Sequence, residues 1–382
     1  MTISGVVAAP LRFGTGPAAA VLGAVRVAAP ATRDQLVADT GLSAATVNRQ
    51  VNALLEAGLV TERPDLLGHS GVGRPKVPLT LDRDRFCVAG MHVGARRTAL
   101  VIADIGGRTL YSHAIRTKEL AATDASAAVD RLCELLAELA GRFSGRQVLW
   151  AGAALGGVVD DHTGVVDHPI LNWDRQPLGQ RLHEALGVRV SVSEHVQAMA
   201  AAELLMTSTM ERTGSSLFFY ARETVGMALI IDGEVHQPAH GAGTIAGLPV
   251  RPGVLDEQPV AGLQSVIGTA ATKAAAARLG VAASAGVVAD DRARVLGEAV
   301  AAMRDVLNPD EIVVAGDAFS AHPHGLEPVQ AAFDATTLLP QPLEIVPTSF
   351  GVQVPDAAAI AVALSAVYAD PLGVVCGTYP RS

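Results

Sequence analysis

The stretch TRDQLVADTGLSAATVNRQVNALLEAGLV, residues 32–60, carries the start and stop signals of two short helices joined by a tight turn. Thr32 has a glutamine three residues later, which is the spacing of a capping box and predicts the start of the first helix. Gly41 ends that helix, Ser43 caps the second one, and Gly58 terminates it. The stretch therefore predicts a helix-turn-helix.

Polar side chains of the second helix cluster in its N-terminal half, which is the part of a recognition helix that reaches base edges. Asparagine, glutamine and arginine are the side chains able to make bidentate contacts there. Together with the start of the first helix, the expected DNA-contacting residues are Thr32, Arg33, Ser43, Thr46, Asn48, Arg49 and Gln50. The alternative is an ordinary helical hairpin inside a larger core.

The segment after the second helix has the pattern of a wing. Val60 and Thr61 predict a strand, and HSGVGRPKVPLTLD, residues 69–82, supplies a glycine-rich basic tip and a returning strand. Arg74 and Lys76 stand at the tip, where they would contact phosphates or the minor groove. A solvated linker turn is the alternative.

Charge confines any nucleic-acid contact to the N-terminal part of the chain. The 382 residues carry a net charge of −9, but residues 1–85 hold nine Lys+Arg against seven Asp+Glu, which leaves twenty against thirty-one for the remainder. An acidic whole repels nucleic acid. DNA binding must therefore use locally placed basic residues of the N-terminal module.

Composition places the chain among cytoplasmic proteins. The cysteines Cys87, Cys133 and Cys376 are too scattered for a disulfide framework or a clustered zinc site. Charges such as Arg26 and Asp104 are expected to interrupt every apolar run before it reaches membrane-spanning length. Because residues 1–11 also lack the pattern of a secretory signal, we expect a cytoplasmic location and no membrane partner.

From residue 86 onward, short strands alternate with helices. Three strand-like segments precede a helix that apolar residues at helical spacing predict over 125–143. A second unit begins near Ser215 with a hairpin pattern whose turn contains Asp232 and Gly233. The order of segments indicates a duplicated α/β architecture.

Four stretches together carry a resemblance to a known family: residues 41–60 with the later GRP, then LNWDRQPLGQRLHEALGVRVSVSEHVQAMAAAE, HGAGTIAGLPV and LNPDEIVVAG. They resemble the ROK family, which groups sugar kinases with repressors that add a winged helix-turn-helix to the same actin-like fold. The resemblance covers almost the whole chain. It implies a mostly α winged helix-turn-helix over 1–82 and a two-lobed α/β actin-like (ribonuclease H-like) domain over 83–382. Lobe one would take residues 83–195 with a C-terminal helix over 355–370, and lobe two residues 196–354.

The residues that handle phosphate groups in the family's kinases are replaced in this chain. The Asp-x-Gly-Gly-Thr loop of the kinases reads His92 to Arg96 here, without the acid and the threonine. Residues 104–107 imitate that loop but fall between two alternating strands, where a hairpin turn is expected. In the second phosphate loop Glu223 would repel a triphosphate, and His195 takes the place of the catalytic aspartate. The resemblance thus implies no ATP cofactor and no enzyme activity; the alternative is a divergent sugar kinase with His195 as its base.

The sugar and zinc positions of the family are altered as well. Residues 243–247 stand at the position of the family's Gly-Glu-x-Gly-His segment and contain neither its glutamate nor its histidine. No cysteine lies between Arg251 and Thr269, so no zinc is expected. Candidate effector-binding residues, by position, are Asn172, Glu194, His195, His240 and Thr244. The alternative is that each is a satisfied polar residue at a subdomain junction.

These observations predict a sequence-specific regulator, in the first instance a repressor, that binds a double-stranded DNA operator. Paired modules read paired half-sites, so a homodimer or homotetramer is expected. The C-terminal domain would serve oligomerisation and the sensing of a sugar-like effector. A regulator that responds to a protein partner without a small-molecule effector is the alternative.

Overall fold

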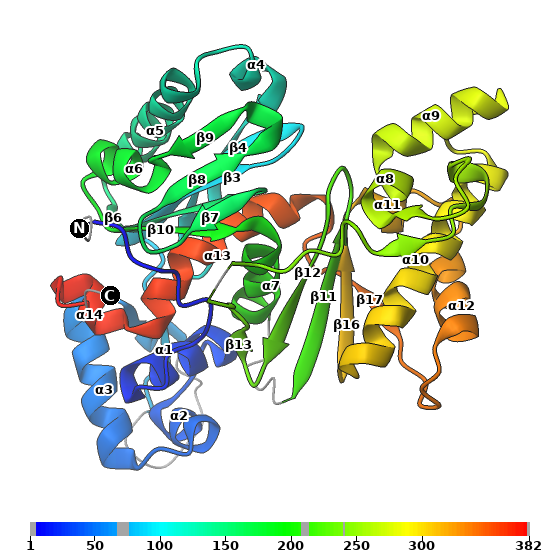
Figure 1. The fold of residues 1–382 in the computed structure, drawn as a ribbon. Helices are drawn as coiled ribbons and strands as arrows, with labels where there is room; N and C mark the ends of the chain where they lie inside the picture. Colours follow the sequence, from blue (N-terminus) through cyan, green and yellow to red (C-terminus); the bar gives the residue numbers. More distant parts are fainter. Residues whose placement is uncertain (1–4, 67–75, 208–213, 240, 380–382) are drawn as a thin grey trace. The chain divides into compact units, whose positions relative to one another are not determined.

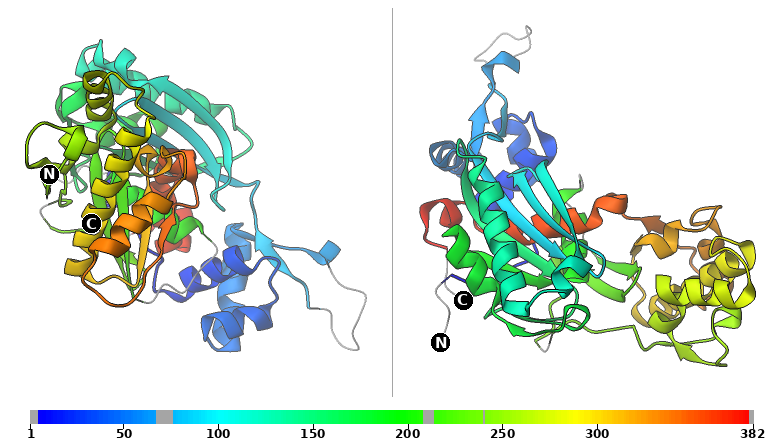
Figure 2. Two further views of the ribbon diagram at one scale, coloured as in Figure 1. Left: turned by 90° about the vertical axis from the view of Figure 1, so that its right-hand side faces the viewer. Right: turned by 90° about the horizontal axis from the view of Figure 1, so that it is seen from above.

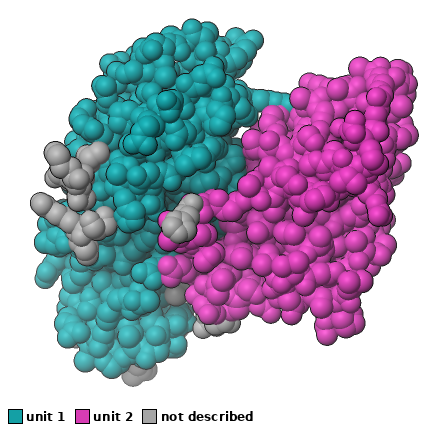
Figure 3. All heavy atoms as spheres, viewed as in Figure 1, with its two compact units in different colours: residues 1–211, 355–382 teal, residues 212–354 magenta. Residues whose placement is uncertain are grey.

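The computed structural model describes residues 5–66, 76–207, 214–239 and 241–379, and the chain divides into two compact units (Figure 3). Unit 1 comprises residues 1–211 and 355–382, and unit 2 comprises residues 212–354. Unit 1 therefore contains both chain ends, while unit 2 is inserted between its two parts. Each unit has its own sheet and core.

In its described residues, the N-terminal module of unit 1 contains three α-helices and a two-stranded ribbon (Figure 1). Its elements are α1 (Pro17–Ala28), α2 (Arg33–Thr40), α3 (Ala44–Ala57), β1 (Val60–Glu62) and β2 (Leu79–Leu81), the two strands pairing antiparallel. Thr32 forms the predicted capping box with Gln35, and the left-handed Gly41 and Gly58 end α2 and α3. The predicted helix signals of residues 32–60 are confirmed.

One face of each helix in this module is apolar and buried. Val21 and Val25 of α1, Leu36 of α2 and Val51 and Leu54 of α3 are fully buried together. The helices are short, so this shared core, rather than helix propensity, holds them in place. The opposite face of α3 is left for solvent.

A five-stranded sheet forms the centre of unit 1, in the order β10-β6-β3-β4-β5. Its strands are β3 (Phe86–Val93), β4 (Arg97–Asp104), β5 (Thr109–Arg116), β6 (Gln147–Leu155) and β10 (Val190–Glu194). β3, β6 and β10 run parallel, and β4 and β5 run antiparallel to their neighbours. The turn between β4 and β5 begins at Asp104, so the predicted hairpin turn over residues 104–107 is confirmed.

Helices cover both faces of this sheet (Figures 1 and 2). The helices α5 (Ala125–Gly141) and α6 (Leu178–Leu186) pack on one face, and α13 (Val354–Ala369) packs on the other. The smaller elements are α4 (Thr117–Ala121), a three-stranded sheet of β7 (Val158–Asp160), β8 (Val165–His168) and β9 (Trp173–Gln176), and α7 (His195–Met206).

Glycines let α13 lie very close to the strands. A Cβ on Gly90 would stand 2.8 Å from the Ala359 backbone, and one on Gly152 would stand 2.5 Å from the backbone nitrogen of Ala363. Real Cβ atoms do not approach so closely, so only glycine fits at these two strand positions. The helix is buried from Val354 to Tyr368, as expected for a helix that is apolar on all sides.

The segment Gly351–Ala369 is long and apolar enough to cross a membrane, by length and composition only, and 78% of it is buried inside the protein. The expectation that charges interrupt every apolar run before this length was therefore wrong for this segment. The only acidic side chain of this segment, Asp356, lies in the first turn of α13, so no charged residue interrupts the remainder of the helix.

Contacts within unit 1 do not follow the boundaries expected from the sequence. The first described residues do not pack within the N-terminal module but pair with the five-stranded sheet of unit 1, where Val6 forms a parallel bridge with Val190 of β10. At the other end of the chain, α14 (Pro371–Cys376) packs against α1 and α3. The helix α7 belongs to unit 1, because it follows β10 directly and packs on β6 and β10, so unit 2 begins after residue 211 instead of near 196.

Unit 2 repeats the sheet of unit 1 in the order β13-β12-β11-β16-β17. These strands are β11 (Ser215–Ala221), β12 (Val225–Ile231), β13 (Glu234–Val235), β16 (Glu311–Ala315) and β17 (Ile345–Pro347). In both units an antiparallel hairpin adjoins two further parallel strands, so the predicted duplication is confirmed. The remaining elements are β14 (Pro249–Val250), β15 (Ala261–Gly262), α8 (Leu263–Ile267), α9 (Thr269–Leu279), α10 (Gly286–Leu307), α11 (Asp317–Ser320) and α12 (Glu327–Thr336).

Candidate functional site

The first candidate site is the N-terminal half of α3, whose polar side chains face solvent. Ser43 Oγ caps the helix by accepting a hydrogen bond from the Thr46 backbone N–H at 3.2 Å. Asn48 and Arg49 are exposed, and Gln50 is half-buried. Because Val47 and Val51 anchor the other side of the helix in the core, these polar groups sit on a rigid element and point outward.

Two further predicted residues, at the start of α2, make structural contacts. Thr32 uses its hydroxyl as the N-cap of the helix. Arg33 is half-buried and donates to Glu62 at 3.1 Å and to Asn52 at 3.2 Å, which joins α2 to α3 and β1. Lys76 forms an ion pair with Asp34 and is exposed. Arg74 lies outside the described residues.

The second candidate site lies at the carboxyl ends of the parallel strands β3, β6 and β10, the edge where ligands bind in open α/β sheets. His92, one residue before the end of β3, stacks on His195, with ring centroids 5.8 Å apart and an interplanar angle of 5°. A Cβ on Gly156, just after β6, would stand 3.0 Å from the His195 ring. The three strand ends therefore converge around one buried imidazole.

Glu194 and His195 join β10 to α7. Glu194 Oε2 accepts hydrogen bonds from the backbone N–H groups of Val196 at 2.8 Å and Gln197 at 3.0 Å, so this carboxylate caps the helix. Its other oxygen lies 3.5 Å from His195 Nε2. Burial raises the pKa of Glu194 to about 7 and lowers the pKa of His195 to about 4.

A third histidine belongs to the same region. His168, at the end of β8, is buried against the edge of Trp173, with centroids 6.1 Å apart. Burial and then the nearby His195 lower the pKa of His168 to about 4. At neutral pH both imidazoles are therefore uncharged, and the site presents neutral hydrogen-bonding groups beside a carboxyl group that titrates near pH 7.

The other predicted effector residues belong to different parts of the chain. Asn172 is exposed and left-handed, with φ 53°, and directly precedes Trp173. Thr244 belongs to unit 2, where its hydroxyl accepts a hydrogen bond from the Ala246 N–H at 3.1 Å. His240 lies outside the described residues. His92 and His168 were not predicted from the sequence as effector-binding residues, although His92 stands at the position of the family's first phosphate loop.

In unit 2, the position of the second phosphate loop contains a network of opposite charges. Arg222 lies 3.3 Å from Glu223 and 3.5 Å from Asp317, and Arg292 lies 3.9 Å from Asp317. Arg292 also donates to the Ile267 carbonyl at 2.9 Å. The arginine and carboxylate side chains at this position thus pair with one another.

The segment where the family implies zinc lacks the cysteines of that site. Residues 251–269 contain no cysteine, and Arg278 and Arg294 instead donate to the carbonyls of Val254 and Arg251. Within the described part of the chain, no group of three or more His, Cys, Asp or Glu residues could hold a metal ion. The described residues therefore do not form the cysteine and histidine zinc site that the family implies.

Comparison with solved structures defines the class of fold. A ROK family transcriptional regulator, a homologue of the Escherichia coli Mlc protein, superposes with a TM-score of 0.74 at 23% identity and covers 94% of this chain and 98% of its own. A ROK hexokinase from Thermus thermophilus superposes with a TM-score of 0.59 at 21% identity, over 73% of this chain and 98% of its own. The two-lobed fold is thus shared by regulators and sugar kinases.

Sequence comparison identifies the family. The ROK family model matches residues 88–248. A transcriptional regulator of Mycobacterium tuberculosis H37Rv is 45% identical over 95% of this chain and 88% of its own length, and the xylose repressor of Bacillus subtilis is 22% identical over 56% and 54%. The chain belongs to the ROK family, and its relatives that align over almost its whole length are transcriptional regulators.

Proposed function

We propose that the protein is a sequence-specific DNA-binding transcriptional regulator that acts as a repressor in the cytoplasm. The proposal rests mainly on the exposed, polar N-terminal half of α3. This helix belongs to the module that also contains α1, α2 and the antiparallel ribbon of β1 and β2. This arrangement supports a winged helix-turn-helix, in which the second helix of the motif lies in the major groove.

Each part of the module has a role in this proposal. Asn48, Arg49 and Gln50 read base edges from α3, while Ser43, Thr46 and Thr32 approach phosphates at the helix ends. Arg33 and Lys76 stand beside Glu62 and Asp34, which hold them near the DNA-facing surface. A homodimer or homotetramer would present two such modules to paired half-sites.

We propose that the sheet domains sense a ligand and do not transfer phosphate. Two features support this. The residue at the position of the catalytic base, His195, is buried against His92 and accepts a proton only near pH 4, which is far from the pKa of an effective base at neutral pH. The charge network of Arg222, Glu223 and Asp317 would also have to open before a triphosphate could bind. No ATP and no zinc are required.

The cluster around Glu194 supports a neutral, sugar-like effector. Hydroxyl groups can both donate and accept, which suits an uncharged imidazole and a carboxyl group that changes its charge near pH 7. Asn172 lies on the loop that precedes Trp173 and could add an amide.

The test is a binding titration by fluorescence anisotropy with fragments of the upstream region of the gene, in moderate salt with excess competitor DNA. We expect nanomolar binding of one fragment that Arg49→Ala weakens. The matched control is Arg131→Ala, which removes an exposed arginine from α5 and should leave binding unchanged. Equal binding of all fragments, or ATP hydrolysis by the purified protein, would contradict the proposal.

A further inference from the structure

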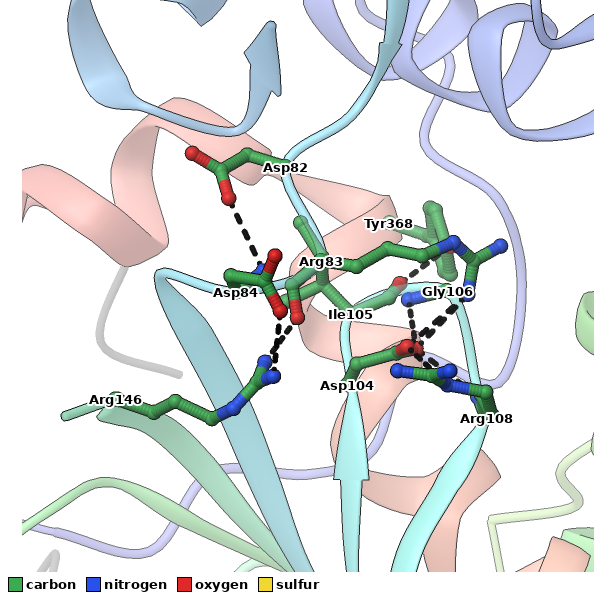
Figure 4. Close-up of polar contacts among 9 residues, drawn as sticks. All are labelled: Asp82, Arg83, Asp84, Asp104, Ile105, Gly106, Arg108, Arg146 and Tyr368. Atoms are coloured by element: carbon green, nitrogen blue, oxygen red, sulfur yellow. Dashed lines mark hydrogen bonds and ion pairs between the residues drawn. The ribbon is translucent and has the colours of Figure 1, made fainter. Parts of the chain in front are cut away.

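The segment that joins the N-terminal module to the sheet of unit 1 is short and held on both sides. Residues 82–85 connect β2 to β3, and Asp82 Oδ1 accepts hydrogen bonds from the backbone N–H groups of Asp84 and Arg85, each at 3.1 Å. Arg146, at the start of the β6 region, donates to the Arg83 carbonyl and to Asp84 (Figure 4). The connection is therefore ordered and contains no glycine.

Asp104 links this joining segment to the β4–β5 turn through hydrogen bonds and ion pairs. Its carboxylate is completely buried and accepts hydrogen bonds from the N–H groups of Gly106 at 2.9 Å and Arg108 at 3.0 Å. Arg83 reaches both carboxylate oxygens at 3.1 Å, and Arg108 approaches at 3.3 Å. A buried carboxylate left without its cation is strongly unfavourable, so the Arg83 contact fixes the joining segment in place.

The C-terminal end of α13 meets the same turn. The Tyr368 hydroxyl donates to the Ile105 carbonyl at 2.7 Å (Figure 4). On its other side the Tyr368 ring contacts the N-terminal module, because the Arg26 guanidinium of α1 lies 5.6 Å from the ring centroid. One buried side chain thus touches both the sheet of unit 1 and the N-terminal module.

The other end of α13 is anchored where the chain returns from unit 2. Asp356 forms a two-point contact with Arg97 of β4, at 2.7 and 3.2 Å, and accepts a hydrogen bond from Ser112 of β5 at 2.6 Å. Unit 1 resumes at Pro355, one residue earlier. With a rise of 1.5 Å per residue, Asp356 and Tyr368 lie about 18 Å apart along a rigid, buried helix.

Space beside the joining segment permits movement of the module. A hollow of about 610 Å³ is lined by Arg26, Thr61 and Thr80 from the module and by Arg83 and Arg108 from the joining segment and the turn. At this place the ribbon of the module and the joining segment are therefore not packed tightly against each other.

We propose that α13 is a strut that transmits changes at the return from unit 2 to the N-terminal module, through Tyr368 with Arg26 and through the turn that Asp104 fastens to Arg83. This inference rests on the proposed function, because the module is the part that would bind DNA. It assigns Asp104, Asp356 and Tyr368 as positioning residues for DNA recognition.

The test measures the orientation of the module without requiring DNA. Spin labels at Glu56→Cys on α3 and Glu138→Cys on α5, two exposed positions within unit 1, are introduced with Cys376→Ser, since Cys87 and Cys133 are buried. Double electron–electron resonance should give one narrow distance distribution for this parent. Tyr368→Phe keeps the ring but loses the hydroxyl, and Asp104→Asn keeps an acceptor for the turn but loses the charge; both should broaden the distribution.

The strut itself is tested by a double-mutant cycle in affinity for the upstream fragment. Asp356→Asn, at the far end of α13, should change the Kd about fivefold or more. In the Tyr368→Phe background the same substitution should have little further effect, because the connection is already broken. The control Glu119→Gln removes an exposed ion pair with Arg116 and should change neither measurement.

Unchanged distance distributions in folded Tyr368→Phe and Asp104→Asn would overturn the inference, as would additive effects in the cycle. Circular dichroism and melting curves establish that each variant is folded; Tyr368→Phe is the gentler substitution if Asp104→Asn unfolds. If the parent binds no DNA but the distributions broaden, the proposed function fails while the positioning role of α13 stands.

Discussion

Acidification should destabilise unit 1 through His168, and the structure gives the magnitude. The unfolded chain protonates this imidazole near its ordinary pKa of 6.5, whereas the folded protein holds the pKa at about 4, mainly because the ring is buried. Between these values the unfolded state binds more protons, so the free energy of unfolding falls as the pH decreases. One pKa unit corresponds to about 1.4 kcal/mol, so His168 alone accounts for about 3 kcal/mol between pH 7 and pH 4.

The neighbouring groups act in opposite directions. His195, with a pKa also lowered to about 4, adds a loss of the same sign. Glu194, with a pKa raised to about 7, is protonated more readily in the folded state, so its contribution to stability grows as the pH decreases. The comparison of the parent with His168→Gln isolates His168 from these and all other groups.

The assay is urea unfolding at several pH values between 7 and 4, followed by tryptophan fluorescence. The two tryptophans, Trp150 and Trp173, both lie in unit 1, and Trp173 packs against His168. The parent should lose about 3 kcal/mol more than His168→Gln over this range. His162→Gln, at an exposed position, should match the parent. Parallel pH profiles for the parent and His168→Gln would refute the argument.

Five further outcomes are expected. Arg49→Ala should weaken binding to the specific fragment by about 1–3 kcal/mol, whereas Lys76→Ala should mainly flatten the dependence of log Kd on log salt; both are read by anisotropy titration. Thr32→Ala removes the cap of α2 and should lower the unfolding free energy by about 1 kcal/mol in urea titrations. Leu54→Ala removes a fully buried side chain of α3 and should cost about 2–5 kcal/mol, against less than about 0.5 for the exposed Glu56→Ala. Gly152→Ala places a Cβ against α13 and should destabilise unit 1 by about 1–3 kcal/mol, measured by thermal unfolding.

Local features were predicted well from the sequence because short-range chemistry determines them. The caps at Thr32 and Ser43, the ends at Gly41 and Gly58, and the hairpin turn at Asp104 each depend on residues a few positions apart. The duplicated sheets followed from the order of strand-like segments. In each case the residues that form the pattern lie close together in the sequence.

Long-range contacts were not predicted, because no local pattern encodes them. The pairing of Val6 with Val190 and the packing of α14 on α3 join parts of the chain that are far apart in sequence. The stacking of His92 on His195 needed the strand order of the sheet, which places the ends of β3 and β10 on either side of β6. The role of Asp104 was hidden for the same reason, since Arg83 and Tyr368 reach its turn from separate elements.

Because α13 follows the strands of unit 2 in the sequence, it is synthesised after both sheets. Residues 214–354 can form their own sheet as soon as they leave the ribosome, whereas the face of β3 and β6 around Gly90 and Gly152 stays bare until residue 369 has emerged. A chain that stops before Val354 would expose that apolar face and would have no helix to hold its N-terminal module. Unit 1 therefore completes its core only after the whole of unit 2 has been synthesised.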